Sequence, residues 1–278
     1  MDAMAQQDKI TTIDVMRAIL ARNRAALALG ISLGAVVFGA SLVLRVADHK
    51  SVTAVQTDLA AERAEMVTTV EAHAKQASTT LGRNYIAPEV LKAVSAVPRH
   101  EFVPDRLRGD AYADRPLPIG YGQTISQPFI VALMTDLARV RPDDAVLEVG
   151  TGSGYQAAVL AHLARRVYTI EIVPGLADSA ATRLQRLGYS NVVARTGDGY
   201  YGWEEAAPFD SIIVTAAASQ IPPPLIRQLK PEGRMVIPVG APFAVQYLVL
   251  VERDPDKGRV TTRQLLPVRF VPLASGGQ

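Results

Sequence analysis

The sequence predicts an α/β protein built on a doubly wound, mostly parallel sheet. From residue 145 onward, short segments rich in Val and Ile alternate with segments of helical periodicity, as is typical of parallel strands joined by helices. The apolar segments are continuous, which indicates strands covered on both faces. A glycine-rich stretch, GTGSG (150–154), directly follows the first of them. In such sheets the first strand-to-helix turn is the usual ligand site.

Two helices are expected ahead of the sheet, at 86–97 and 129–140, with Gly- and Pro-rich loops between them over 99–128. Strands are then predicted at 145–150, 167–172, 191–196, 209–217 and 234–240, and helices at 155–164, 176–188 and 222–230. The last two strands, 247–253 and 264–273, have no helix between them. We therefore expect an antiparallel hairpin at one edge of the sheet.

Composition excludes several classes of site. The 278 residues carry a net charge of only +2, without a long run of Lys and Arg, so a nucleic acid partner is not expected. The chain has no cysteine, which excludes disulfides, thiolate nucleophiles and zinc–cysteine sites. The four histidines lack the close spacing of metal ligands, and no metal site is predicted.

The segment AALALGISLGAVVFGASLVL (25–44) is an uncharged run of twenty residues, preceded by a polar leader at 1–24. Twenty apolar residues are what a helix needs to cross a hydrocarbon core of about 30 Å. The alternative is a cleaved signal peptide. The leader is long for one, and Arg45 lies where the cleavage pattern requires a small residue. We therefore predict a single transmembrane helix that anchors the protein in a lipid bilayer.

The orientation of this span follows from its basic flanks. Four basic residues precede it and three follow it. The excess favours a cytoplasmic N-terminus, with the bulk of the chain on the other side. Because the margin is one residue, the charges do not decide which side of the membrane the globular part faces.

Residues 45–81 contain no Gly or Pro and are rich in Ala and Glu. Their apolar residues fall near helical spacing, which predicts a helical connector, with a short coiled coil as the alternative. Gly82 is a natural stop signal for that helix. Residues 82–278 are expected to form the globular domain.

The spacing around the glycine loop distinguishes between ligands. No Gly-Lys-Ser/Thr follows the glycines, which excludes a Walker loop, and Tyr155 lies where a dinucleotide fingerprint requires its third glycine. Glu148 lies two residues before Gly150. A carboxylate there would repel a pyrophosphate, but it suits a ligand that carries an ammonium or sulfonium group.

Two further acids follow later strands. Glu171 ends the second strand, where an acid can accept both hydroxyls of a ribose, and Asp198 follows the third, in reach of an adenine amino group. Together these features predict S-adenosyl-L-methionine as the cofactor; the alternative is a structural turn with incidental acids. The predicted cofactor-binding residues are Glu148, Gly150, Thr151, Gly152, Ser153, Gly154, Tyr155, Glu171, Asp198 and Gly199.

Several motifs are specific to one family. They are VPRHEFVP (97–104), PIGYGQTISQP (118–128), VLEVGTGSGYQAAVLA (146–161), GDGYYGW (197–203), PFDSIIVTAA (208–217) and VRFVPL (268–273). In this order they resemble protein-L-isoaspartate O-methyltransferases. The resemblance implies the class I S-adenosylmethionine-dependent methyltransferase fold. It also implies methyl transfer to the carboxylate of L-isoaspartyl residues in damaged proteins. The apolar segment and the connector lie outside the resemblance. Ordinary members of the family are soluble.

A carboxylate is already ionised at neutral pH, so this reaction needs orientation rather than a general base. By resemblance Ser126 is the active-site serine, and Gln123 and Thr124 add polar groups that position the substrate. No base accompanies Ser126, so we expect it to donate a hydrogen bond and not to act as a nucleophile. The alternative is that Ser126 is the N-cap of the following helix, with Pro128 in its first turn.

His100 is expected to support its loop, and Trp203 to pack under the adenine side. The leading hypothesis is a membrane-anchored isoaspartyl methyltransferase that acts on isoaspartyl proteins or peptides. A second is an enzyme that methylates another carboxylate or a small molecule at the membrane. A third is a methyltransferase-fold subunit of a membrane complex with little or no isoaspartyl activity, which would have other membrane proteins as partners.

Overall fold

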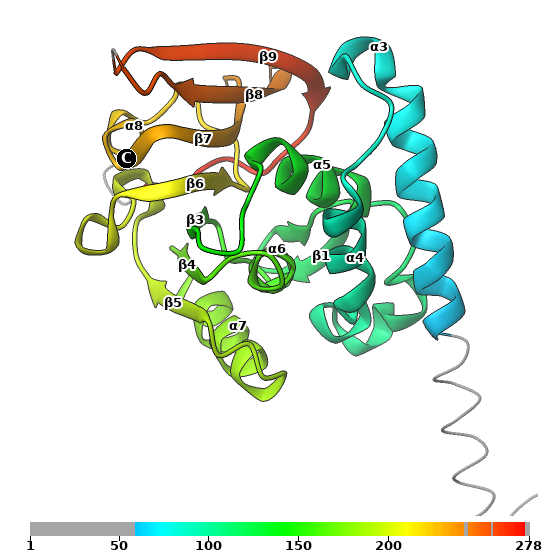
Figure 1. The fold of residues 1–278 in the computed structure, drawn as a ribbon. Helices are drawn as coiled ribbons and strands as arrows, with labels where there is room; N and C mark the ends of the chain where they lie inside the picture. The colour runs from blue at the N-terminus through cyan, green and yellow to red at the C-terminus, as the bar shows by residue number, and fades with distance from the viewer. Residues whose placement is uncertain (1–58, 242–243, 257, 276–278) are drawn as a thin grey trace, which may run out of the picture. The chain divides into compact units, whose positions relative to one another are not determined.

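The computed structural model describes residues 59–241, 244–256 and 258–275 (Figure 1). The leader 1–24, the apolar segment 25–44 and the first part of the predicted connector lie outside the described residues. Within the described ranges, no helix combines the length and the apolar character that a membrane crossing requires.

The domain is built around a seven-stranded sheet in the order β5-β4-β3-β6-β7-β8-β9 (Figure 1). Its strands are β3 (Ala145–Val149), β4 (Arg166–Glu171), β5 (Val192–Thr196), β6 (Phe209–Val214), β7 (Leu229–Val239), β8 (Gln246–Arg253) and β9 (Val260–Val268). The pairs from β5 to β7 are parallel, whereas β7–β8 and β8–β9 are antiparallel. The predicted α/β class and the antiparallel hairpin at one edge are confirmed.

Helices cover the parallel strands. The α-helices that follow Gly82 are α4 (Pro88–Ala96), α5 (Pro128–Ala138), α6 (Tyr155–Ala161), α7 (Pro174–Arg186) and α8 (Pro223–Arg227). Helices α6 and α7 pack on the half of the sheet that contains β3, β4 and β5, whereas α5 packs on β6 and β7. The centre of β6 is accordingly buried at consecutive positions, as the continuous apolar run of the sequence predicts for a strand covered on both faces.

Strand β3 lies at the point where the winding of the sheet reverses. The chain proceeds from β3 outward through β4 to β5, and then returns to place β6 on the other side of β3. The connections that leave the carboxyl ends of β3 and β6 run in opposite directions, to β4 and to β7, which opens a crevice between them. The topology therefore places the glycine loop at the natural ligand site of the sheet.

The region 99–128, which was expected to form loops, contains more structure than its Gly and Pro content indicates. Two 3₁₀-helices, η1 (Arg99–Phe102) and η2 (Asp105–Asp110), precede a hairpin of β1 (Leu117–Gly120) and β2 (Gln123–Ile125). The two residues at the turn, Tyr121 and Gly122, have φ angles of 52° and 72°. A tight hairpin favours this left-handed conformation, but a tyrosine is a rare choice for it, so the sequence contains no clear hairpin signal.

The predicted helix 222–230 ends at Arg227, and β7 begins at Leu229 rather than at 234. Strand β9 spans 260–268 rather than 264–273. Beyond it the chain leaves β8 and runs beside Ala217, whose N–H donates to the Val271 carbonyl at 2.8 Å. The apolar residues of the sequence continue from β9 into the segment that follows it. Their pattern therefore could not show where β9 ends and the chain leaves β8.

The described part of the predicted connector is helical, over 59–76 and again in α3 (Ser78–Leu81). Helix α3 ends at Gly82 in the left-handed conformation, with φ of 70°. Met66, Val70 and Ala74, four residues apart, form a buried stripe. Residues from Ala61 onward belong to one compact unit. This differs from the expected boundary at 82, because a helix with a buried stripe is part of the core rather than a spacer (Figure 1).

Val70→Asp should therefore lower the free energy of unfolding by about 3 kcal/mol or more, since it places an unpaired charge in an apolar site. Ala72→Asp, two residues away on the exposed face of the same helix, should change it by less than about 0.5 kcal/mol. Urea unfolding of both variants measures the difference. Equal and small effects would mean that this helix does not pack on the domain.

Candidate active site

A cavity, called here the central cavity, lies at the carboxyl ends of β3 and β4. Most of the predicted ligand-binding residues line it, although they come from distant parts of the chain. Those residues are Gln123, Thr124, Ser126, Glu148, Gly150, Thr151, Gly152, Ser153, Tyr155, Glu171 and Gly199. Gly154 and Asp198 are the two predicted residues that do not line it.

The glycine loop makes a turn that most side chains would prevent. Gly150 has a φ of 96°, and a Cβ atom on it would lie 2.4 Å from Oγ1 of Thr215. The same Oγ1 donates a hydrogen bond of 2.6 Å to the Gly150 carbonyl. Gly154 has a φ of 88°, and a Cβ there would lie 3.2 Å from the Leu184 side chain of α7. Gly150 therefore allows the tight turn, and Gly154 allows close packing of α7, although Gly154 itself does not face the cavity.

Glu148 lies fully buried on β3 with one carboxylate oxygen unpaired. The Thr169 hydroxyl donates to Oε2 at 2.6 Å, and Thr151 in turn donates to Thr169 at 2.6 Å. Oε1 is buried and has no hydrogen-bond partner within the described residues. Burial raises the pKa of Glu148 to about 8, against the opposing effect of the Thr169 hydrogen bond. An unpaired buried carboxylate oxygen at a cavity wall is suited to a cationic ligand.

Glu171 is held in place by the backbone at the end of β4. Oε2 accepts from the Gly152 N–H at 2.8 Å, and Oε1 accepts from the Val173 N–H at 3.0 Å. A carboxylate has about four acceptor positions, so these two bonds leave capacity for further donors from the cavity. Such an arrangement fits a pair of adjacent hydroxyl groups, as the sequence predicts for this acid.

Asp198 instead caps the 3₁₀-helix η3 (Gly199–Tyr201). Its Oδ1 accepts from the Tyr200 N–H at 2.9 Å, and its Oδ2 accepts from the Ser275 hydroxyl at 2.8 Å. The neighbouring Gly199 lines the cavity, and a Cβ on Gly199 would lie 2.3 Å from the Val149 side chain. Gly199 therefore lines the cavity, whereas Asp198 caps η3 and is not among the lining residues.

The predicted substrate-positioning residues lie at the cavity wall, in β2 and directly after it. Ser126 lies between β2 and α5, beside Gln123 and Thr124. The N-cap of α5 is Gln127, and Pro128 is in the first turn. The alternative role of Ser126 as the helix cap is therefore wrong, because the helix begins one residue later than that role requires.

The C-terminal segment 271–274 also lines the central cavity, which the sequence analysis missed. The bonds between this segment and Ala217 place it there. A second depression, called here the side groove, adjoins the cavity and shares Thr124, Ser126, Thr215 and Val271 with it. Its other lining residues include His73 and Gln76 of the first helix, Phe129 and Ile130 of α5, and residues 266–270.

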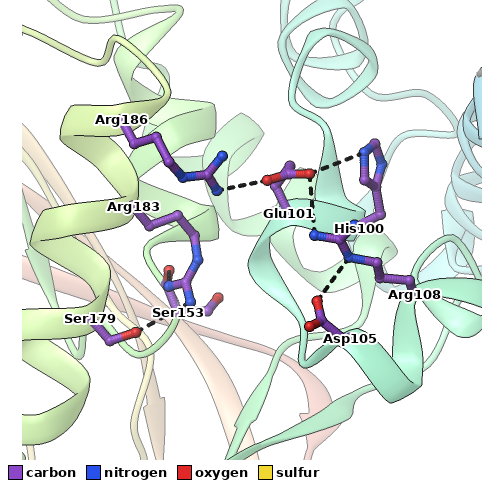
Figure 2. A network of polar contacts seen from close by, with 8 residues as sticks. All are labelled: His100, Glu101, Asp105, Arg108, Ser153, Ser179, Arg183 and Arg186. Atoms are coloured by element: carbon purple, nitrogen blue, oxygen red, sulfur yellow. Dashed lines mark hydrogen bonds and ion pairs between the residues drawn. The ribbon is translucent and has the colours of Figure 1, made fainter.

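Helix α7 carries two arginines that contact other segments, of which Arg183 holds the glycine loop (Figure 2). Arg183 donates from Nη1 to the Ser153 carbonyl at 2.9 Å. One turn later, Arg186 forms an ion pair of 2.7 Å with Glu101 of η1. Helix α7 therefore connects the cofactor loop with the segment that precedes the β1–β2 hairpin.

His100 and Trp203 do not line the central cavity. Nδ1 of His100 is hydrogen-bonded to the Tyr112 hydroxyl at 2.7 Å. Trp203 packs edge-on against Tyr168, and the Arg195 guanidinium lies 4.2 Å from the centre of its ring. Both residues make structural contacts. In the described ranges, no three acidic or histidine side chains gather into a group that could hold a metal ion.

The family model of the protein-L-isoaspartate(D-aspartate) O-methyltransferases matches residues 78–278. The chain belongs to this family. It is 63% identical over 223 residues to protein-L-isoaspartate O-methyltransferase 1 of Cupriavidus necator, which covers 80% of this chain and 86% of the relative. It is 59% identical over 235 residues to protein-L-isoaspartate O-methyltransferase 2 of Syntrophobacter fumaroxidans, with coverages of 84% and 95%.

Solved structures agree with the sequence relatives. One protein-L-isoaspartate O-methyltransferase superposes with a TM-score of 0.66 at 27% identity, over 77% of this chain and 66% of that one. A putative enzyme of this type from Plasmodium falciparum, solved with S-adenosyl-L-homocysteine, has a TM-score of 0.58 at 26% identity, with coverages of 68% and 91%. The chain is therefore a protein-L-isoaspartate O-methyltransferase with S-adenosylmethionine as its cofactor.

The central cavity of this methyltransferase fits that cofactor. Among the described residues that line it are two carboxylates, Glu148 and Glu171, and no Lys, Arg or His. A cation is favoured in such a site, and the buried Oε1 of Glu148 lacks a partner that a cationic ligand can supply. Glu171 and the turn at Gly150 would hold the ribose end and the adjoining part of the cofactor. When bound, S-adenosylmethionine supplies an electrophilic methyl group.

We expect the affinity for S-adenosylmethionine to rise with pH between about 6 and 8. Glu148, with a pKa near 8 in the free protein, is mostly protonated at pH 7, and a cationic ligand favours its ionised form. Binding at pH 7 should therefore release a proton. Calorimetry in buffers of different ionisation enthalpy measures that release.

Glu148→Gln is the matched control, because its neutral amide has a similar shape and cannot titrate. It should bind more weakly and lose the part of the pH dependence that belongs to Glu148. Ionisation of the ligand itself is common to both proteins and cancels in the comparison. Equal proton release by the variant and the natural protein would show that Glu148 is not the titrating group.

Proposed function

We propose that this chain is a membrane-anchored enzyme that methylates the free carboxylate of L-isoaspartyl residues in damaged proteins, with Ser126 as the residue that orients that carboxylate. One observation supports the proposal most. The central cavity combines buried acids suited to a cationic methyl donor with neutral polar groups around Ser126, and it opens beside the side groove.

The charges of the reactants explain why neutral groups suit the substrate side. Methyl transfer from a sulfonium to a carboxylate converts a cation and an anion into two neutral groups. A lysine or arginine against the carboxylate would stabilise the anion more than the transition state, in which the charge is decreasing. Hydrogen bonds from neutral donors hold the anion with a smaller penalty of this kind, and the cavity is lined by no basic side chain.

Orientation is then the main contribution of the protein. The carboxylate oxygen must lie in line with the methyl carbon and the sulfur, and correct placement of two reactants can lower a barrier by about 7 kcal/mol or more. Ser126, Thr124 and Gln123 lie on one short segment at the cavity wall. We assign to them the positioning of the carboxylate. The side groove, which shares Ser126, would hold the peptide on one side of the isoaspartyl residue.

Ser126→Ala should lower kcat for an isoaspartyl peptide about 10- to 100-fold, which corresponds to one hydrogen bond to a charged group. Its Kd for S-adenosylmethionine should stay within about twofold of the natural value. Methyl transfer to an isoaspartyl peptide, with the aspartyl isomer as the negative substrate, measures the change. Ser126→Thr keeps the hydroxyl and should retain more activity. Absence of isoaspartyl turnover by the natural protein, with normal cofactor binding, would refute the proposed activity.

The apolar segment 25–44 supports the membrane part of the proposal. In cell fractionation, the full chain should remain with membranes after alkaline carbonate extraction, since an integral span resists that treatment. A variant that starts at residue 52 should be released and should keep its turnover of isoaspartyl peptides. Protease access to the C-terminus in spheroplasts then reports which side the domain faces. A full chain that is extracted by carbonate would refute the anchor.

A further inference from the structure

Arg99 is a fully buried arginine close to the active site. It lies in η1, with no exposed surface. Its Nε donates to the Ala111 carbonyl at 2.8 Å, and its Nη2 donates to the Ser126 carbonyl at 2.7 Å. The guanidinium carbon lies 4.7 Å from the centre of the Tyr155 ring. Nη1 has no hydrogen-bond partner within the described residues.

These contacts join the two halves of the site. Ser126 belongs to the segment that positions the substrate carboxylate in the proposed function. Tyr155 begins α6 directly after the glycine loop, and it lines the central cavity. A single planar group therefore contacts the backbone of the substrate segment and the side chain that begins the cofactor helix. Arg99 itself does not line the cavity.

Stability alone does not explain a charge at this position. No carboxylate of the described residues forms an ion pair with Arg99, and its partners are two carbonyls and an aromatic face. Burial lowers the pKa of the guanidinium, and Tyr155 opposes that shift, but an arginine stays protonated in proteins. Buried charges of this kind are often no more stabilising than apolar residues of the same size. We therefore look to a property of arginine other than its charge or its size to explain this position.

That property is its geometry. The guanidinium is flat and has its donors in a fixed fork, so it can bond two carbonyls in its plane while it stacks on a ring. A lysine has the charge but neither the fork nor the flat face. The angle between the Ser126 segment and α6 is therefore determined by a rigid group rather than by a flexible side chain.

We propose that Arg99 is a positioning residue for methyl transfer. Through the Ser126 carbonyl and the Tyr155 ring it sets the placement of the substrate segment relative to the cofactor loop, and so the alignment of the carboxylate with the methyl group. This inference rests on the proposed role of Ser126. It concerns the chemical step and not the binding of either ligand.

The test uses Arg99→Lys and Arg99→Met in the full chain. Both should lower the single-turnover rate about 10- to 100-fold at saturating ligands, because a displacement of about 1 Å has that effect on an oriented reaction. The Kd for S-adenosylmethionine and the KM for an isoaspartyl peptide should change by less than about threefold. Rates are measured well below the thermal midpoint of each protein, so that the folded enzyme is compared.

Arg186→Gln is the matched control. Arg186 contacts the same 3₁₀-helix through Glu101 (Figure 2), but its side chain is 57% exposed and is not among the residues that line the cavity. Its turnover should equal that of the natural protein. A purely structural Arg99 would give folded variants with natural rates, which would overturn the inference. Restoration of the rate by lysine would also overturn it, since charge alone would then suffice.

A second variant guards against failure of the Arg99 variants to fold. Tyr155→Leu removes the stacked ring and leaves the two carbonyl bonds. It should lower the single-turnover rate, and in combination with Arg99→Lys the losses should be less than additive, because both changes disturb one contact. Additive losses, or an unchanged rate in Tyr155→Leu, would overturn the inference. Absence of turnover by the natural enzyme would instead refute the proposed function, so the two failures are distinguishable.

Discussion

The active site depends on the sharp turn that follows β3. Gly150 adopts a left-handed conformation there, and its N–H donates to the Ile170 carbonyl at 2.8 Å. Thr215, at the end of the neighbouring strand, bonds the Gly150 carbonyl from the other side. The turn is thus joined to both neighbours of β3 at the point where the sheet reverses its winding. Every other ligand-binding segment is arranged around this turn.

The electrostatics of the site follow from what the turn buries. Glu148 lies on β3 just before it, with an orphaned oxygen, and Glu171 at the end of β4 bonds the Gly152 N–H within it. None of the described residues that line the cavity is basic, so these acids favour a cation there. The cofactor carries such a charge, and its binding would supply the partner that the buried oxygen of Glu148 lacks among the described residues. Cofactor binding and the protonation of Glu148 would then be linked.

The side proposed for the substrate is assembled from segments that are far apart in the sequence. Ser126 follows β2 directly, the first helix contributes His73 to the side groove, and residues 271–274 also line the central cavity. Arg99 and Arg183 each hold a backbone carbonyl of a ligand-binding segment, at Ser126 and Ser153 respectively. A reaction that depends on alignment gains from such rigid contacts, because small displacements of one segment against the other would change its rate.

Local patterns in the sequence were sufficient to predict the sheet, the glycine turn and most of the residues that line the cavity. Continuous apolar strands, glycines at restricted positions and acids at strand ends express constraints that act over a few residues, and these are readable without coordinates. The capping contact of Asp198 could not be predicted, because a carboxylate after a strand can either face a ligand or cap the next turn.

Only the tertiary structure determined which distant segments meet. The buried stripe of Met66, Val70 and Ala74 looks in the sequence like the face of any amphipathic helix. Arg99 resembles an ordinary surface arginine until the fold encloses it between Ser126 and Tyr155. Contacts of this kind depend on the three-dimensional path of the chain, for which a single sequence carries no local signal. The sequence therefore determined the chemistry of the site, and the fold determined its alignment.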